Sequence, residues 1–165
     1  VNTLVVDKTG TLTEGKPSVV AIEPAEGLSA DDLLRLTAAV EQSSQHPLGA
    51  AIVAAAAARG MAVAAMSEFD APTGKGVIAT VDARRVAIGT AAWLAEIGAD
   101  VTGLAEAADR HRRDGATAVL VAIDGKPAGV IAIADPVKAS TPAALSALRE
   151  AGIRVIMLTG DNRVT

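Results

Sequence analysis

The sequence contains no cysteine and no tyrosine, and it has one phenylalanine and one tryptophan, Phe69 and Trp93. Without cysteine the chain can form neither disulfides nor thiolate metal sites. His46 and His111 are its only imidazoles, and their spacing is not that of a metal-binding pair. Half of the residues are apolar, with alanine prominent among them. We therefore expect a core of small side chains in helices and of valine and isoleucine in strands.

Long apolar runs and basic runs are also missing. The longest strictly apolar run covers residues 50–58 and is ended by Arg59, whereas a membrane-spanning helix needs about 20 such residues. A net charge of −4 without a basic run argues against nucleic acid as a partner. Asp7 and Lys8 interrupt the start of the chain, so no signal peptide is predicted. Because the chain begins without methionine and stops soon after Asp161, we expect a soluble fragment of a larger protein.

The two ends of the chain share one pattern, a buried strand followed by a loop suited to phosphate. Residues 3–7 are apolar and β-branched and end on the carboxylate of Asp7, and residues 8–13 supply a glycine and several hydroxyls. Near the other end, a helix starting at Thr141 and an apolar strand over 153–158 lead to Thr159-Gly160-Asp161. Parallel strands of this kind bind ligands at their carboxyl ends.

The segment between these ends has the pattern of mixed helices and antiparallel strands. Helices are predicted from Ser29, which begins a capping box, over residues 48–59 behind Pro47, and over 102–114. Hairpins are predicted around residues 82–84 and around Asp124-Gly125. The remaining strand is expected over 18–22, with hairpin strands at 76–82, 85–88, 118–123 and 129–134.

Three motifs carry a resemblance to a known family. The seven residues Asp7-Lys8-Thr9-Gly10-Thr11-Leu12-Thr13 resemble the phosphorylation motif of P-type ATPases, ion pumps of the haloacid-dehalogenase superfamily. Ser44-Gln45-His46-Pro47-Leu48 resembles the His-Pro motif of the branch that transports heavy metals, and Thr159-Gly160-Asp161-Asn162 resembles the second phosphate-site motif of the family. The resemblance extends over the whole chain.

This resemblance implies an α/β fold in which a partial haloacid-dehalogenase-like, Rossmannoid core is interrupted by an α+β nucleotide-binding domain. The inserted domain would have an antiparallel sheet flanked by helices. Residues 1–16 and 134–165 would form part of the phosphorylation domain, and residues 17–133 the nucleotide-binding domain. Asp135 and Lys138 resemble the hinge motif of the family, although a surface Asp-Pro turn would have the same sequence.

For the core, the resemblance implies ATP and Mg²⁺ as cofactors. Asp7 would be the nucleophile that becomes an aspartyl phosphate and, with the backbone carbonyl of Thr9, a ligand of Mg²⁺. Catalytic roles would also fall to Lys8, Thr159, Gly160 and Asp161. Thr9 stands where hydrolytic members of the superfamily carry an aspartate that acts as general acid and base. Since loss of such a group costs about 10²–10⁴-fold in rate, the acyl phosphate should persist, as a pump requires.

For the insert, the resemblance implies an ATP pocket whose lining residues come from separate parts of the sequence. Because aromatic rings are scarce, His46 is the natural partner for the purine, and Glu41 would face the adenine amino group. Gly74 and Gly76 would let the backbone approach the nucleotide, and Val77 would supply apolar contact. Gly89 matches another glycine of the pocket, while the arginines around His111 are interpreted as a solvated face. The predicted nucleotide-binding residues are Glu41, His46, Gly74, Gly76, Val77 and Gly89.

The sequence leaves three functions open. The first is the ATP-binding cytosolic portion of a heavy-metal pump, with copper(I) as the expected ion and zinc, cadmium or lead as alternatives. Its partners would be ATP and the remaining phosphorylation, actuator and transmembrane domains of the pump, at the cytoplasmic face of a bacterial plasma membrane. The fragment alone would bind nucleotide without turnover. The others are a haloacid-dehalogenase-like phosphatase with a cap domain and a non-catalytic nucleotide-binding module.

Overall fold

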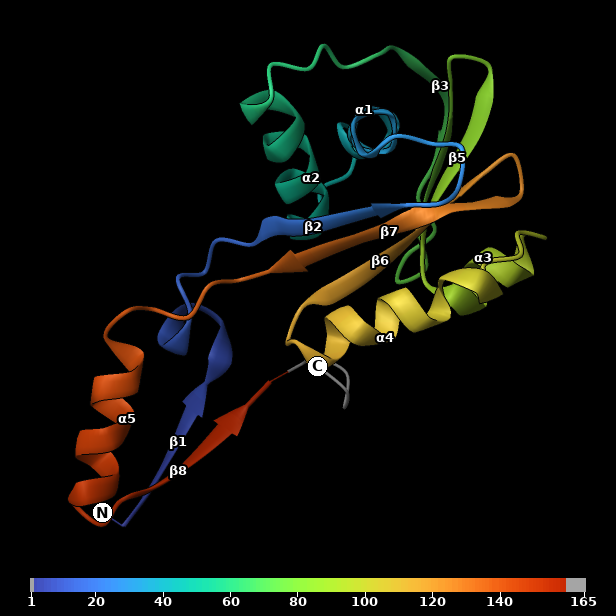
Figure 1. Ribbon diagram of the computed structural model, residues 1–165. Helices are drawn as coiled ribbons and strands as arrows, with labels where there is room; N and C mark the ends of the chain where they lie inside the picture. The colour runs from blue at the N-terminus through green and yellow to red at the C-terminus, as the bar shows by residue number, and fades with distance from the viewer. Residues whose placement is uncertain (1, 160–165) are drawn as a thin grey trace. The chain divides into compact units, whose positions relative to one another are not determined.

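The chain divides into two compact units, which are described separately here (Figure 1). The computed structural model describes residues 2–159, so the predicted site residues Gly160 and Asp161 lie outside the described residues. One unit combines the residues up to Pro17 with the segment that begins at Asp135, and the other comprises Ser18–Ala134. Within the described residues, no helix is long and apolar enough to cross a membrane.

The first unit is built on a parallel strand pair. β1 (Thr3–Asp7) lies beside β8 (Arg154–Leu158), with Asp7 opposite Leu158. The helix α5 (Thr141–Glu150) precedes β8, begins with a proline in its first turn and is followed by Gly152 at φ 74°. These are the predicted strand, helix and strand, and their parallel pairing is what a Rossmannoid α/β core requires.

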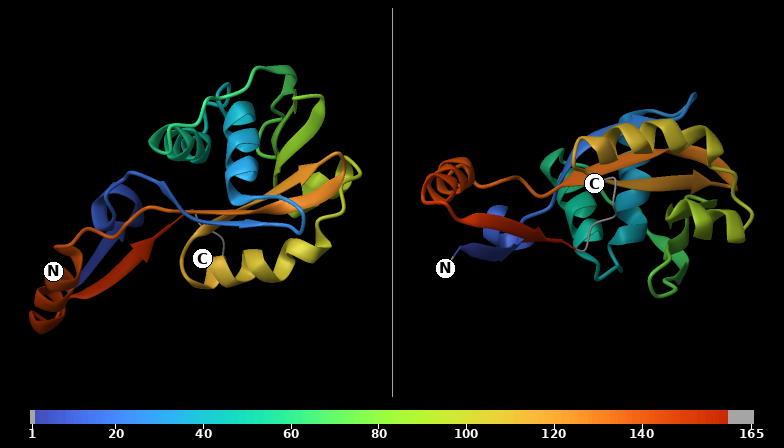
Figure 2. Two further views of the ribbon diagram at one scale, coloured as in Figure 1. Left: turned by 45° about the horizontal axis from the view of Figure 1, so that its top comes forward. Right: turned by 90° about the horizontal axis from the view of Figure 1, so that it is seen from below.

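The second unit is built on an antiparallel sheet in which α1 (Ala30–Glu41) and α2 (Pro47–Ala58) cover one face. The short helix α3 (Ala91–Glu96), a single 3₁₀ turn at Thr102–Leu104 and α4 (Ala105–Arg113) cover the other face, as Figures 1 and 2 show. The strands, in spatial order, are β2 (Ser18–Pro24), β7 (Lys126–Ala134), β6 (Thr117–Ile123), β5 (Arg84–Gly89), β4 (Gly76–Val81) and β3 (Met66–Asp70).

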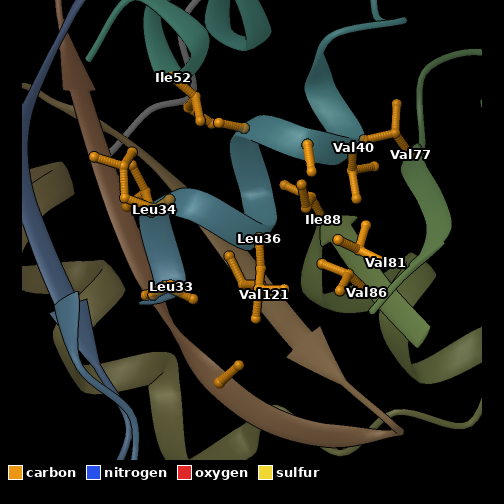
Figure 3. Packing of buried hydrophobic residues seen from close by; sticks show 14 of the residues in the cluster. Leu33, Leu34, Leu36, Val40, Ile52, Val77, Val81, Val86, Ile88 and Val121 are labelled. Carbon is orange, nitrogen blue, oxygen red and sulfur yellow. The ribbon is translucent and has the colours of Figure 1, made fainter. Parts of the chain in front are cut away.

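Side chains alternate between two apolar clusters because successive residues of a strand point to opposite faces. In β6, Val121 joins the cluster under α1 and α2, whereas Leu120 joins the one under α3 and α4. Figure 3 shows the first cluster, where Leu36 and Val40 of α1 lie together with strand residues such as Val121 and Ile88. This packing holds α1 against the sheet, together with Glu41, the predicted site residue at the last position of the helix.

The ends of α1 and α2 are defined by local signals. The Ser29 side chain accepts a hydrogen bond from the Asp32 backbone N–H at 3.0 Å, which confirms the predicted cap. Although proline commonly ends a helix, Pro47 does not end α1, which already stops at Glu41. Pro47 instead occupies the first turn of α2, where its missing N–H costs nothing.

Two strand predictions were incomplete. The strand Met66–Asp70 was not predicted, because Glu68 has a φ of 53° and a register shift interrupts the alternation that would have indicated it. β7 begins at Lys126, three residues before the predicted start, and passes through Pro127 with a register shift in its pairing to β6. Proline and glycine in this stretch concealed the strand.

Candidate functional site

Asp7 lies at the carboxyl end of β1, in the first unit. Its side chain is exposed, and its pairing with Leu158 places the end of β1 beside the end of β8. Thr159 follows β8 directly and is also exposed. The structure therefore brings two of the predicted phosphoryl-site residues to the same edge of the parallel pair.

The loop Lys8–Leu12 follows Asp7 and is closed by Thr13. Gly10 adopts φ 76°, which glycine reaches at little cost, and its N–H donates to the Thr13 hydroxyl oxygen at 3.1 Å. The Thr13 backbone N–H donates to the Lys8 carbonyl at 3.2 Å. Thr13 is only 2% exposed, so this buried residue fixes the two ends of the loop.

Asp135 accepts three hydrogen bonds from the segment that follows the loop. The Thr13 hydroxyl donates to its carboxylate at 2.5 Å, and the backbone N–H groups of Gly15 and Lys16 donate at 3.1 and 2.9 Å. Because charged acceptors form the stronger hydrogen bonds, this one side chain ties the end of the phosphorylation motif to the start of the segment 135–138. The sequence alternative was a surface Asp-Pro turn, whereas Asp135 is half-buried and its carboxylate accepts these three hydrogen bonds.

Lys138 and Thr141 also hold this loop. The Lys138 ammonium donates to the Gly10 carbonyl at 2.7 Å, and its backbone N–H donates to the Leu12 carbonyl at 3.0 Å. The Thr141 hydroxyl also donates to Leu12, at 2.8 Å. Side chains that the phosphorylation motif does not contain therefore set the shape of the loop after Asp7.

In the second unit, all six predicted nucleotide-binding residues line one pocket. Its volume is about 370 Å³, within the usual range for small-molecule sites. They come from α1, the start of α2, the turn before β4, β4 itself and the end of β5, and Ile88 and Val119 add apolar surface. The lining residues that were predicted are Glu41, His46, Gly74, Gly76, Val77 and Gly89.

His46 caps a helix and also presents a hydrogen-bond donor at the pocket. Its ring Nδ1 accepts a hydrogen bond from the Leu48 backbone N–H at 3.2 Å, so the side chain caps the N-terminus of α2. In a neutral imidazole this places the hydrogen on Nε2, which is then a donor. The side chain is exposed at the pocket, where that donor is available to a ligand.

Glu41 is the buried acid of the pocket. It is 7% exposed, and its Oε2 is the only buried side-chain oxygen or nitrogen in the described part of the chain that has no hydrogen-bond partner. Burial raises the pKa of the Glu41 carboxyl above its ordinary value of 4.5, while the Ser44 hydroxyl and His46 act in the opposite direction. An acceptor in this position suits a ligand that donates a hydrogen bond.

The glycines at the pocket edge are required by packing. A Cβ added at Gly76 would overlap the Ile88 carbonyl oxygen and lie 2.5 Å from the Trp93 ring, and one at Gly89 would lie 2.6 Å from both the Lys75 carbonyl oxygen and that ring. The paired glycines therefore make room for the neighbouring backbone and for the buried indole, a reason that the sequence did not reveal. Gly74 differs, since its φ of 73° lies in the region that favours glycine.

A second cavity, of about 480 Å³, lies beside α3 and α4. It is larger but is lined mainly by alanine and other small residues, and it contains none of the predicted site residues. Arg112 lines both cavities and pairs with Asp109 at 2.9 Å. Its interpretation as part of a solvated face was therefore incomplete, because helical spacing alone does not reveal what a strand brings near the helix.

Comparison with known proteins identifies the family. The family model described as haloacid dehalogenase-like hydrolase matches residues 1–165. The chain belongs to this family. Among curated relatives, the silver-exporting P-type ATPase of Salmonella typhimurium is 53% identical over all 165 residues of the chain, which cover 20% of that protein. Further relatives, 37–47% identical, are named copper-exporting or copper-transporting ATPases.

Solved structures place this haloacid dehalogenase-like chain among the same proteins. A zinc-transporting PIB-type ATPase in the E2.Pi state aligns with a TM-score of 0.81 at 39% identity, covering 99% of this chain and 26% of that one. The N-domain of HMA6, a copper-transporting P-type ATPase, aligns with a TM-score of 0.61 at 33% identity, covering 72% of this chain and 99% of that domain. The resemblance to heavy-metal P-type ATPases is confirmed. The chain spans about a fifth of the length of the curated relatives that it matches.

Proposed function

We propose that this chain is the ATP-binding cytosolic portion of a heavy-metal-translocating P-type ATPase. The unit Ser18–Ala134 is the nucleotide-binding domain, and the unit that contains Asp7 is part of the phosphorylation domain. The observation that carries the proposal is the gathering of all six nucleotide-binding residues, predicted from separate stretches of sequence, around one pocket. P-type ATPases are ion-translocating ATP hydrolases that in general use ATP and Mg²⁺.

In the proposed reaction, a carboxylate oxygen of Asp7 attacks the γ-phosphorus of ATP in line. The bond between the γ-phosphorus and its bridging oxygen breaks, ADP leaves with the electron pair, and Asp7 becomes an aspartyl phosphate. Water later hydrolyses this intermediate to carboxylate and inorganic phosphate. The Gly10 turn, fixed by Thr13, Asp135 and Lys138, keeps the backbone after Asp7 in one shape while the phosphoryl group arrives.

The residues at Asp7 fit a magnesium ion that is completed by its substrate. Mg²⁺ is usually held by one or two carboxylates together with substrate phosphates and water. The Asp7 carboxylate and the Thr9 carbonyl would supply the protein ligands, and the ion would neutralise charge between the carboxylate and the phosphates. Within the described residues there is no group of three or more acidic or imidazole side chains, as a site made only of protein ligands would need.

Thr9 favours a pump over a phosphatase. Its hydroxyl is not a general base near neutral pH, so this position cannot activate the water that hydrolyses the intermediate. A phosphoenzyme that persists leaves time for a conformational step in the complete protein. We therefore propose that the 165-residue chain binds ATP without sustained hydrolysis, and that rapid hydrolysis of simple phosphate esters would instead indicate a phosphatase.

For the complete protein, we propose copper(I) as the transported ion, supported by the names of the copper- and silver-exporting relatives. The remaining phosphorylation, actuator and transmembrane domains would be its partners, with this portion at the cytoplasmic face of a bacterial plasma membrane. Labelling with γ-³²P-ATP tests the central step. The full-length protein with Mg²⁺ and copper(I) should acquire acid-stable label that Asp7→Asn abolishes, and label that persists in Asp7→Asn would refute the proposal.

A further inference from the structure

The first turn of α2 contains a glycine, Gly49, at a position where the backbone conformation does not require glycine. Gly49 is buried at the third position of α2, and its φ is not positive. Within a helix, glycine costs about 1 kcal/mol relative to alanine. Alanine fills most of the rest of this helix, so the helix itself gives no reason to avoid it at position 49.

The neighbour of Gly49 supplies the reason. A Cβ built on Gly49 would overlap Oε2 of Glu41, and it would lie 3.0 Å from the Glu41 Cδ and 3.2 Å from the Ser44 hydroxyl oxygen. The Glu41 carboxyl could not keep its position beside an alanine. The Glu41 carboxylate therefore occupies the space that a side chain at position 49 would fill.

The oxygen in this space is the buried, unpartnered Oε2 described above. Glu41 lines the pocket, and the apolar side chains of Val77 and Ile88 line it as well. A buried acceptor without a donor is costly unless a ligand supplies the donor. Among purines, adenine carries an exocyclic amino group that can donate, whereas a 6-oxopurine presents an acceptor at the same place and would be repelled.

We propose that Gly49 is a positioning residue for base selectivity: by leaving room for the Glu41 carboxylate, it lets the pocket prefer 6-aminopurine over 6-oxopurine nucleotides. This inference rests on the proposed ATP-binding function. Gly49 itself supplies no side chain to the ligand and acts through Glu41, and its effect should therefore appear only for a ligand that uses the Glu41 acceptor.

The test compares ATP with ITP, its 6-oxo analogue, by isothermal titration of the full 165-residue chain. Gly49→Ala should weaken ATP binding roughly 10- to 100-fold, the usual worth of a hydrogen bond to a charged group. ITP binding should stay within about twofold, because ITP makes no such bond. General damage to the pocket would weaken both nucleotides alike. Gly103→Ala is the matched control, since Gly103 has no positive φ and nothing within 4 Å of its built Cβ.

A double variant keeps the test valid if Gly49→Ala folds poorly. Glu41→Ala removes the overlapping carboxyl, so adding Gly49→Ala to it should fold and should not weaken ATP binding further. A further tenfold loss in the double variant would overturn the proposal, as would an ATP-to-ITP ratio that Gly49→Ala leaves unchanged. Equal binding of both nucleotides by the unaltered chain would overturn it as well. Failure to bind either nucleotide would instead overturn the proposed function, and the inference with it.

Discussion

At the scale of single residues, Glu41 and His46 each line the pocket and also affect the stability of the fold. Glu41 keeps a carboxylate oxygen buried without a donor, and His46 caps α2 while it lines the pocket. In the absence of any ligand, the unpartnered Glu41 oxygen lowers the stability of the fold and the His46 cap raises it. They can therefore be separated by substitutions that change one property of the side chain at a time.

Glu41→Gln should stabilise the ligand-free chain at neutral pH. Because burial raises the pKa of Glu41, the folded state holds its proton more tightly than the unfolded state does. The wild-type chain therefore loses stability as the pH rises from 4.5 through the raised pKa, and the neutral glutamine does not. Urea unfolding at several pH values should give equal stabilities near pH 4 and an advantage for Glu41→Gln near pH 8. An advantage of the same size at every pH would contradict this explanation.

His46→Ala and His46→Asn should separate capping from ligand binding. Alanine loses both roles, and loss of an N-cap typically costs about 0.5–2 kcal/mol of stability. Asparagine retains a capping oxygen but has no imidazole. We expect His46→Asn to unfold close to the wild-type midpoint and yet to bind ATP at least tenfold more weakly, by titration calorimetry. Wild-type ATP affinity in His46→Asn would remove the imidazole from the ligand contacts.

At the scale of elements, the loop after β1 depends on a segment more than a hundred residues away in sequence. Asp135 holds Thr13, Gly15 and Lys16, while Lys138 holds Gly10. The segment Asp7–Thr13 therefore contains the proposed nucleophile but not all of the groups that shape its loop.

Asp135→Ala should destabilise this loop by about 1–3 kcal/mol, since it removes the acceptor of the Gly15 and Lys16 N–H groups and leaves the buried Thr13 hydroxyl only the Lys8 carbonyl, at 3.2 Å. Hydrogen exchange of the Gly10 and Thr13 amides, followed by NMR, should quicken accordingly. Asp31→Ala is the matched control, because Asp31 is an exposed aspartate that pairs with Arg59, away from this loop. Equal exchange rates in wild type and Asp135→Ala would show that other contacts suffice to hold the loop.

The elements themselves were largely predictable where local patterns are complete. The Ser29 cap, the Asp124-Gly125 hairpin and the apolar strands ending at Asp7 and Leu158 follow from spacing and turn chemistry. The strand at Met66–Asp70 was missed because its irregular register destroys the period of two. The site was harder, since the spaces around Gly49 and Gly76 depend on Glu41 and Trp93, which only the tertiary structure brings close.

At the scale of the whole molecule, the proposed nucleotide pocket and the loop after Asp7 belong to different compact units. Asp7 is in the unit of β1 and β8, and the described residues that line the pocket all come from the unit Ser18–Ala134. Binding of ATP and chemistry at Asp7 should therefore be separable by substitution.

Asp7→Asn should leave the ATP affinity of the 165-residue chain within about twofold of wild type, because the substitution changes no group of the pocket. Isothermal titration in the presence of Mg²⁺ measures this, with His46→Asn as the variant expected to lose affinity. A tenfold or larger change in ATP affinity for Asp7→Asn would mean that Asp7 takes part in nucleotide binding itself.

The pairing of β2 with β7 has a practical consequence. Ser18, the first residue of β2, pairs with Ala134, the last residue of β7, so the inserted unit enters and leaves through neighbouring residues. A module whose ends meet in this way can be excised as one continuous cassette, or circularly permuted, without stretching its backbone. The same property would let this unit be inserted into a surface loop of an unrelated protein as a nucleotide sensor, with the fluorescence of its single tryptophan, Trp93, as the signal.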